Sequence, residues 1–181
     1  MPNTVQDDNA SVSTIDTVYG EGYAVGLNFD RKFDALQIGL NAHYQSWTKS
    51  PAGRPSDPWG LTISGVIRYA GFTVGGAWMK IEDFRSSATN SQDGTGFEVG
   101  ASYAWGPNAV SFVYREGEDE DTTTIAGSDE IKVYALSYNR GIGPGVRFYA
   151  SGVYADLKGE SAATTDDNKA WVILTGLGLR F

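Results

Sequence analysis

The chain has 181 residues, of which 41% are hydrophobic, yet no run approaches the ~18 consecutive apolar residues of a membrane-spanning helix. Its formal net charge of −8 argues against binding to nucleic acid, which depends on Lys and Arg neutralising phosphates. The absence of cysteine excludes disulfide scaffolds, thiol nucleophiles and cysteine-based metal sites.

In chain order, residues 1–18 are polar and without periodicity, so we expect them to form a loop. From residue 23 onward, apolar and polar side chains alternate in nine stretches, which predicts about nine β-strands. The expected strands span residues 23–30, 36–45, 59–69, 72–78, 97–105, 110–115, 133–139, 146–155 and 171–181.

The connections between these strands alternate strictly between short and long. Short turns are expected at residues 31–34, 70–71, 106–108 and 141–145, and long connections at 46–57, 82–95, 116–130 and 156–169. This alternation is typical of outer-membrane barrels with short periplasmic turns and long outer loops. The sequence therefore predicts an all-β fold, an antiparallel transmembrane β-barrel, with an outer loop segment at 1–18 and barrel strands over 19–181.

Aromatic residues gather at two heights of the predicted strands, as the two membrane interfaces require. Those expected near the outer ends are Tyr44, Trp59, Trp78, Phe97, Tyr114, Tyr134, Tyr154 and Trp171, and those near the periplasmic ends are Phe33, Tyr69, Phe72, Trp105, Tyr138 and Phe181. A soluble β-sandwich or barrel is the alternative, because it also has alternating strands. A soluble fold should expose Lys, Glu and Thr on its second face, whereas small or neutral groups dominate here.

The second face of each strand is expected to line a water-filled lumen. The predicted pore-lining residues are Asn28, Gln37, Asn41, His43, Thr62, Ser64, Arg68, Glu98, Ser102, Arg115, Ser137, Arg147, Ser151 and Arg180. An arginine facing lipid near mid-depth would cost ~2–4 kcal/mol, so the four arginines should point inward. Arg115 is expected towards the outer mouth and the other three towards the periplasmic end. We expect these arginines either to tune the electrostatic field at the mouths of the pore or simply to pair with carboxylates.

Motifs for catalysis, metals and cofactors are nearly absent. The one histidine, His43, lies mid-strand on the polar face, where a lumen-lining role is a simpler explanation than a catalytic triad. The acidic stretch 116–121 lacks the spacing of an EF-hand, and 141–145 is a turn without a following helix to bind phosphate. We therefore expect no enzymatic activity, no metal and no cofactor.

The last strand ends the chain on an apolar face that finishes with a terminal aromatic residue. This ending resembles the C-terminal signature of bacterial outer-membrane β-barrels, which the outer-membrane assembly machinery reads. The resemblance implies that the assembly signal comprises Trp171, Ile173, Leu177, Leu179 and Phe181.

The hairpin Val133–Tyr154 carries a more specific resemblance. Its Tyr-x-Leu-Ser stretch, short turn and tyrosine-rich return strand are similar to the penultimate hairpin of Gram-negative general-diffusion porins, with Asn139-Arg140 in place of a basic pair. The resemblance implies a homotrimer of 16-stranded, water-filled barrels in contact with outer-membrane lipid and lipopolysaccharide. It further implies passive diffusion of small hydrophilic solutes past a constriction made by an inward-folded loop.

The strand number departs from this family, because about nine strands is odd and bacterial single-chain barrels use even numbers. We therefore expect the 181 residues to be the C-terminal portion of a 16-stranded porin. The alternative is a small closed barrel of eight or ten strands with a structural or adhesive role, whose interior side chains would leave little or no channel.

Overall fold

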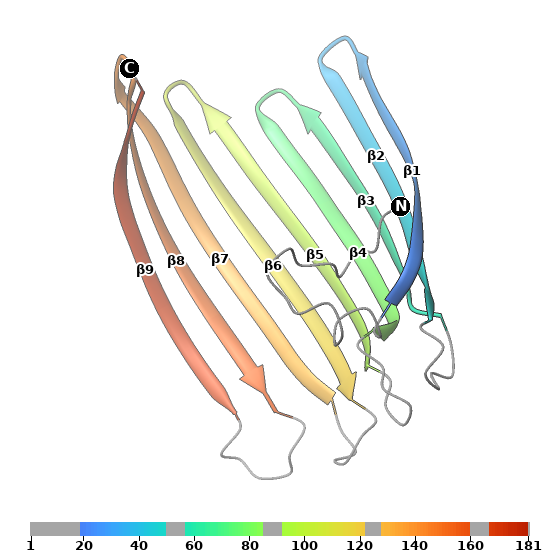
Figure 1. Ribbon diagram of the computed structural model, residues 1–181. Coiled ribbons are helices and arrows are strands. Elements are labelled where there is room, and N and C mark those ends of the chain that lie inside the picture. The colour runs from blue at the N-terminus through green and yellow to red at the C-terminus, as the bar shows by residue number, and fades with distance from the viewer. Residues whose placement is uncertain (1–18, 50–56, 85–91, 122–127, 160–166, 181) are drawn as a thin grey trace.

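The computed structural model describes residues 19–49, 57–84, 92–121, 128–159 and 167–180, which form one curved antiparallel sheet of nine strands (Figure 1). The strands are β1 (Tyr19–Phe33), β2 (Leu36–Lys49), β3 (Trp59–Tyr69), β4 (Phe72–Phe84), β5 (Gln92–Trp105), β6 (Asn108–Asp121), β7 (Ser128–Gly143), β8 (Val146–Lys158) and β9 (Asn168–Leu179). None of the described residues belongs to a helix long and apolar enough to cross a bilayer. The predicted strand number and all-β class are confirmed.

Each strand pairs with its neighbours in sequence, from β1 to β9, so the sheet has two edges, β1 and β9. One end of the sheet carries the short turns and is called the turn end; the other carries the long connections and is called the loop end (Figure 1). Because consecutive strands alternate in direction and nine is odd, β1 and β9 both run towards the turn end. Pairing β1 directly with β9 would therefore give a parallel ladder inside an otherwise antiparallel sheet.

The strands extend further at the loop end than the sequence pattern predicts. Strands β2, β4, β6 and β8 continue to Lys49, Phe84, Asp121 and Lys158, past the positions where long connections were expected to begin. The expected starts at 46, 82, 116 and 156 were wrong. The alternation of apolar and polar residues stops there, but lysines and carboxylates lie on adjacent strands and let the hydrogen-bonded ladder continue.

The turn between β3 and β4 has a residue whose side chain is unfavourable for its conformation. Ala70 and Gly71 both have positive φ, 48° and 87°, which is the pattern of a type I′ hairpin turn. A Cβ atom on Gly71 would lie 2.5 Å from the carbonyl oxygen of Ala104, so glycine is required there. Ala70 has a Cβ atom, which makes its left-handed backbone conformation energetically unfavourable.

Replacing Ala70 with asparagine is therefore expected to stabilise the folded protein by about 0.5–1 kcal/mol, because Asn-Gly is the preferred pair for this turn. The measurement is the free energy of unfolding by urea in lipid vesicles. Ala109→Asn is the matched control, since Ala109 lies in β6 with no positive φ. An equal gain in both variants would contradict the assignment of strain to Ala70.

Candidate pore wall

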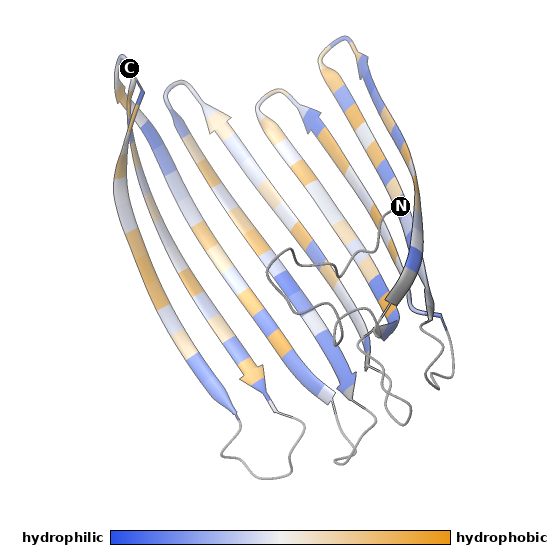
Figure 2. Ribbon diagram, viewed as in Figure 1, coloured by the Kyte–Doolittle hydropathy of each residue, from blue (hydrophilic) through white to orange (hydrophobic). Residues whose placement is uncertain are grey.

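The register of the sheet sorts the side chains onto two faces. Ile63 of β3 lies opposite Ala42 and Trp78, while the next residue, Ser64, lies opposite Asn41 and Ala77. Directly opposed residues project from the same side of a sheet, so these two sets occupy opposite faces. The face of Ile63 is here called the apolar face and that of Ser64 the polar face; the hydropathy bands in Figure 2 alternate accordingly.

Large apolar side chains of the apolar face project into open space. Leu27 is 74% exposed, Ile63 50%, Leu136 59% and Ile173 81%. A water-soluble protein rarely exposes so continuous a hydrophobic surface, which indicates contact with lipid or another apolar partner.

An aromatic row crosses the apolar face towards the loop end. Neighbouring rings in this row have centroids 4.6–6.2 Å apart. The contacting pairs are Tyr23 and Tyr44, Tyr44 and Trp59, Phe97 and Tyr114, Tyr114 and Tyr134, Tyr134 and Tyr154, and Tyr154 and Trp171. The row has the form of an interfacial aromatic girdle.

A second aromatic group lies at the turn end of the same face. The rings of Phe72 and Tyr103 stack at 4.2 Å, and Tyr103 stacks on Trp105 at 5.5 Å. The hydroxyl of Tyr138 donates a hydrogen bond of 2.7 Å to the side-chain oxygen of Asn108. The apolar face thus carries aromatic side chains near both ends, with apolar residues such as Leu136 and Val99 between them.

Thirteen of the fourteen predicted pore-lining residues lie within the ladder on the polar face, and Arg180 follows directly after the end of β9. The thirteen are Asn28, Gln37, Asn41, His43, Thr62, Ser64, Arg68, Glu98, Ser102, Arg115, Ser137, Arg147 and Ser151. The backbone amide of Arg180 donates to the carbonyl of Gly145 at 2.8 Å. That these side chains line water stays a prediction.

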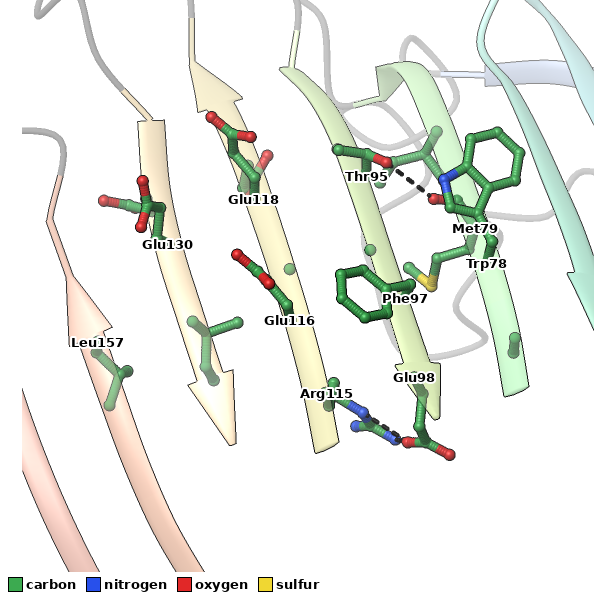
Figure 3. Close-up of a pocket in the computed structure, with 18 of the residues that line it drawn as sticks. Trp78, Met79, Thr95, Phe97, Glu98, Arg115, Glu116, Glu118, Glu130 and Leu157 are labelled. Carbon is green, nitrogen blue, oxygen red and sulfur yellow. Dashed lines mark hydrogen bonds and ion pairs between the residues drawn. The ribbon is translucent and has the colours of Figure 1, made fainter. Parts of the chain in front are cut away.

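An ion pair on the polar face joins two predicted pore-lining residues. Arg115 of β6 donates from Nε and a terminal nitrogen to one carboxylate oxygen of Glu98 of β5, at 2.8 and 2.5 Å (Figure 3). Their side chains are 63% and 40% exposed, so solvent screens the attraction and the pair adds little stability. Among the described residues, Arg68 and Arg147 form no ion pair.

Side-chain hydrogen bonds connect other polar-face residues to one another. The Ser151 hydroxyl donates to that of Ser137 at 2.8 Å, and the Gln37 amide donates to the Asp30 carboxylate at 2.9 Å. No group of His, Cys, Asp or Glu in the described part of the chain could hold a metal ion.

The polar face also has an apolar region that the sequence analysis missed. Met79, Ile81, Ile131 and Leu157 project from this face at its loop end, beside glycines such as Gly94. With these neighbours they line a hollow of about 700 Å³, part of which is drawn in Figure 3. A signal was present in the sequence, because Met79 and Ile81 of β4 and Ile131 of β7 are apolar residues in phase with the polar face.

Charged residues continue the apolar face beyond the aromatic row, at the loop end. This charged rim consists of Lys80, Glu82, Asp93, Glu116, Glu118, Glu120, Glu130, Lys132, Asp156, Lys158 and Lys169. Lys132 contacts Glu116 at 3.2 Å and Glu130 at 3.8 Å, and Lys169 contacts Asp156 at 3.2 Å. The hydrophilic strand ends of Figure 2 correspond to this rim, which lies outside the apolar band.

The described part of the expected assembly signal lies on the apolar face of β9. Trp171, Ile173, Leu177 and Leu179 are 76%, 81%, 60% and 60% exposed. Phe181 lies outside the described residues. These side chains give the edge strand a continuous hydrophobic surface, and their role as a signal stays a prediction.

Comparisons with known proteins agree with the all-β fold described above. A model of the Gram-negative porin family matches residues 2–176. The solved structure of OmpT (in-vitro folded), an outer membrane protein of Vibrio cholerae, is similar with a TM-score of 0.56 at 13% identity. The similarity covers 89% of this chain and 57% of that one, so the chain spans just over half the length of that structure. No curated protein sequence matches. The chain thus belongs to the Gram-negative porin family and is a β-barrel protein of the outer membrane.

Proposed function

We propose that the chain forms the larger part of a water-filled barrel through which small hydrophilic solutes and ions diffuse passively, without catalysis. The observation that carries this proposal is the polar face, on which Ser, Thr, Asn, Gln and Gly recur along most strands opposite a hydrophobic surface. Such a wall offers hydrated passage without a tight binding site.

The direction of the edge strands supports closure by further strands. An antiparallel barrel needs strands next to β1 and β9 that run in the opposite direction, which requires an odd number of additional strands. The nine strands correspond to 57% of the length of the Vibrio cholerae protein. If strands are evenly distributed along that length, the remainder holds about seven further strands. Nine and seven make the sixteen strands of the expected porin barrel.

The competing function is a small closed barrel that conducts nothing and has a structural or adhesive role. The same geometry counts against it, because β1 and β9 would have to pair in parallel. Leaving both edges open in lipid is also costly, since each unsatisfied backbone group costs several kcal/mol.

The test is single-channel recording of the full-length protein in a planar bilayer at 1 M KCl. We expect stepwise currents that rise linearly with voltage, because salt at this concentration shortens the Debye length to about 3 Å and screens the wall charges. Folded protein that inserts into the bilayer without producing steps would contradict the porin function and favour the closed barrel.

We also propose the partners of this barrel. The continuous apolar surface of β1, where Tyr23 and Val25 are each 58% exposed, would contact outer-membrane lipid or a neighbouring subunit of a homotrimer. We expect lipopolysaccharide head groups to contact the charged rim and the assembly machinery to recognise β9.

A further inference from the structure

Two facing glycines form the floor of a trough on the polar face, within the hollow of about 700 Å³ described above. Gly96 of β5 and Gly117 of β6 lie directly opposite each other and carry no side chain. Met79 of β4 lies opposite Gly96 on one side of this floor, and Ile131 of β7 lies opposite Gly117 on the other. The trough thus has a glycine floor between two apolar walls.

The apolar walls adjoin the floor closely and still face open space. A Cβ atom on Gly117 would lie 3.3 Å from Cγ2 of Ile131, and one on Gly96 would lie 3.8 Å from Cγ of Met79. Met79 is 47% exposed and Ile131 is 38% exposed. A mostly apolar hollow of this size falls within the range of about 300–1,000 Å³ that is typical of sites for small organic molecules.

An ion pair borders the trough on the side of the turn end (Figure 3). Glu98 lies two residues along β5 from Gly96, and Arg115 lies two residues along β6 from Gly117. At 3.3 Å per residue, the pair is about 6.6 Å from the glycine floor, which is close to the reach of a leucine side chain. Because the pair is exposed to solvent and weak, a solute can place its own charges against the two groups at little cost.

The row on the other side of the floor, towards the loop end, has a different charge pattern. Asp119 and Asp129 lie directly opposite each other in this row. Two carboxylates side by side can receive an ammonium group but not a carboxylate, whereas Glu98 and Arg115 present one charge of each sign. A molecule with both charges at one end and an apolar group at the other therefore fits the trough in one orientation.

We propose that the trough is a weak binding site for zwitterionic α-amino acids with large apolar side chains. The carboxylate of the amino acid pairs with Arg115 and its ammonium group with Glu98, while its side chain lies on the glycine floor between the apolar walls. The inference rests on the proposed function and names a class of solute that the pore favours. The site has to be weak, since a solute must leave it in order to cross.

The experiment is single-channel recording of the full-length protein at 0.1 M KCl, where the Debye length is about 10 Å, with L-leucine or glycine added. The two amino acids share their charged groups, and each additional methylene that is buried strengthens binding about fourfold. We expect leucine to reduce the mean conductance at concentrations at least about tenfold lower than glycine. Absence of any current before the solute is added would contradict the proposed function. Open channels that respond equally to leucine and glycine would overturn the site alone.

Two analogues with a single charge test the zwitterionic class. Isocaproate is leucine without the ammonium group, and isoamylamine is leucine without the carboxylate. Each loses one of the two exposed charge contacts, so each should need a concentration up to about fivefold higher than leucine for the same reduction of conductance. If either analogue acts at the same concentration as leucine, the assignment to a zwitterion is wrong.

A pair of double variants tests the apolar walls. Met79→Ser with Ile131→Ser removes both walls and should make the effective concentrations of leucine and glycine nearly equal. Val172→Ser with Leu174→Ser is the matched control, because these residues also project from the polar face, are 45% and 52% exposed, and lie outside the trough. The control should keep the difference of the wild type. An equal loss in both variants would place the effect outside the trough.

A third double variant tests the ion pair and leaves the apolar walls intact. Glu98→Gln with Arg115→Gln removes both charges without changing the net charge of the chain. The concentration of leucine that reduces the conductance should rise by about fivefold, because the exposed charge contacts are lost. An unchanged response to leucine in open channels of this variant would overturn the proposed role of the pair.

Discussion

Replacing Leu136 with arginine is expected to cost about 2–4 kcal/mol of folding free energy in a bilayer. Leu136 lies on β7 between Tyr134 and Tyr138, on the apolar face, and is 59% exposed. A charged group there must either enter the hydrocarbon or distort the strand to reach water. The measurement is urea-induced unfolding in lipid vesicles, followed by tryptophan fluorescence.

The adjacent residue gives the matched control. Ser137→Arg places the same side chain at the same depth on the polar face, where it should reach water. It loses the hydrogen bond from Ser151, which costs at most about 1 kcal/mol. Equal destabilisation of the two variants would show that the faces are assigned wrongly or that both are buried.

The existence of the strands and the face of each side chain could be predicted from the sequence because they depend on local alternation. Ile63 and Ser64 differ in polarity, and a side-chain period of two places them on opposite faces whatever the rest of the fold. The turn at Ala70-Gly71 was predicted for the same reason, since few residues and a glycine leave no other connection.

The loop-end boundaries could not be predicted from the same signal. Beyond the aromatic row, hydrophobic alternation gives way to charge on the apolar face, and acidic stretches such as 116–121 resemble loops in composition. The ladder continues because side chains on neighbouring strands pair, for example Lys132 with Glu116. Such partners can be identified only when the register between the two strands is known.

The composition of the polar face was predicted only in part. Single strands show Ser, Gly and Asn opposite apolar residues, which indicates a polar wall. The apolar region around Ile81 and Ile131 becomes evident once β4 to β8 lie side by side, because β4, β7 and β8 each contribute only one or two of its apolar residues. The pair of Glu98 and Arg115 likewise joins two strands and has no signature in either one.

The most direct test of a water-lined polar face is thiol accessibility at two consecutive positions of β3. The chain has no cysteine, so Ser64→Cys and Ile63→Cys each introduce a single thiol into it. In outer membranes, a charged thiol reagent that cannot cross lipid should modify Cys at position 64 and lower the single-channel conductance, while position 63 should stay unmodified. Modification at position 63 with protection at position 64 would contradict a pore wall built on the polar face.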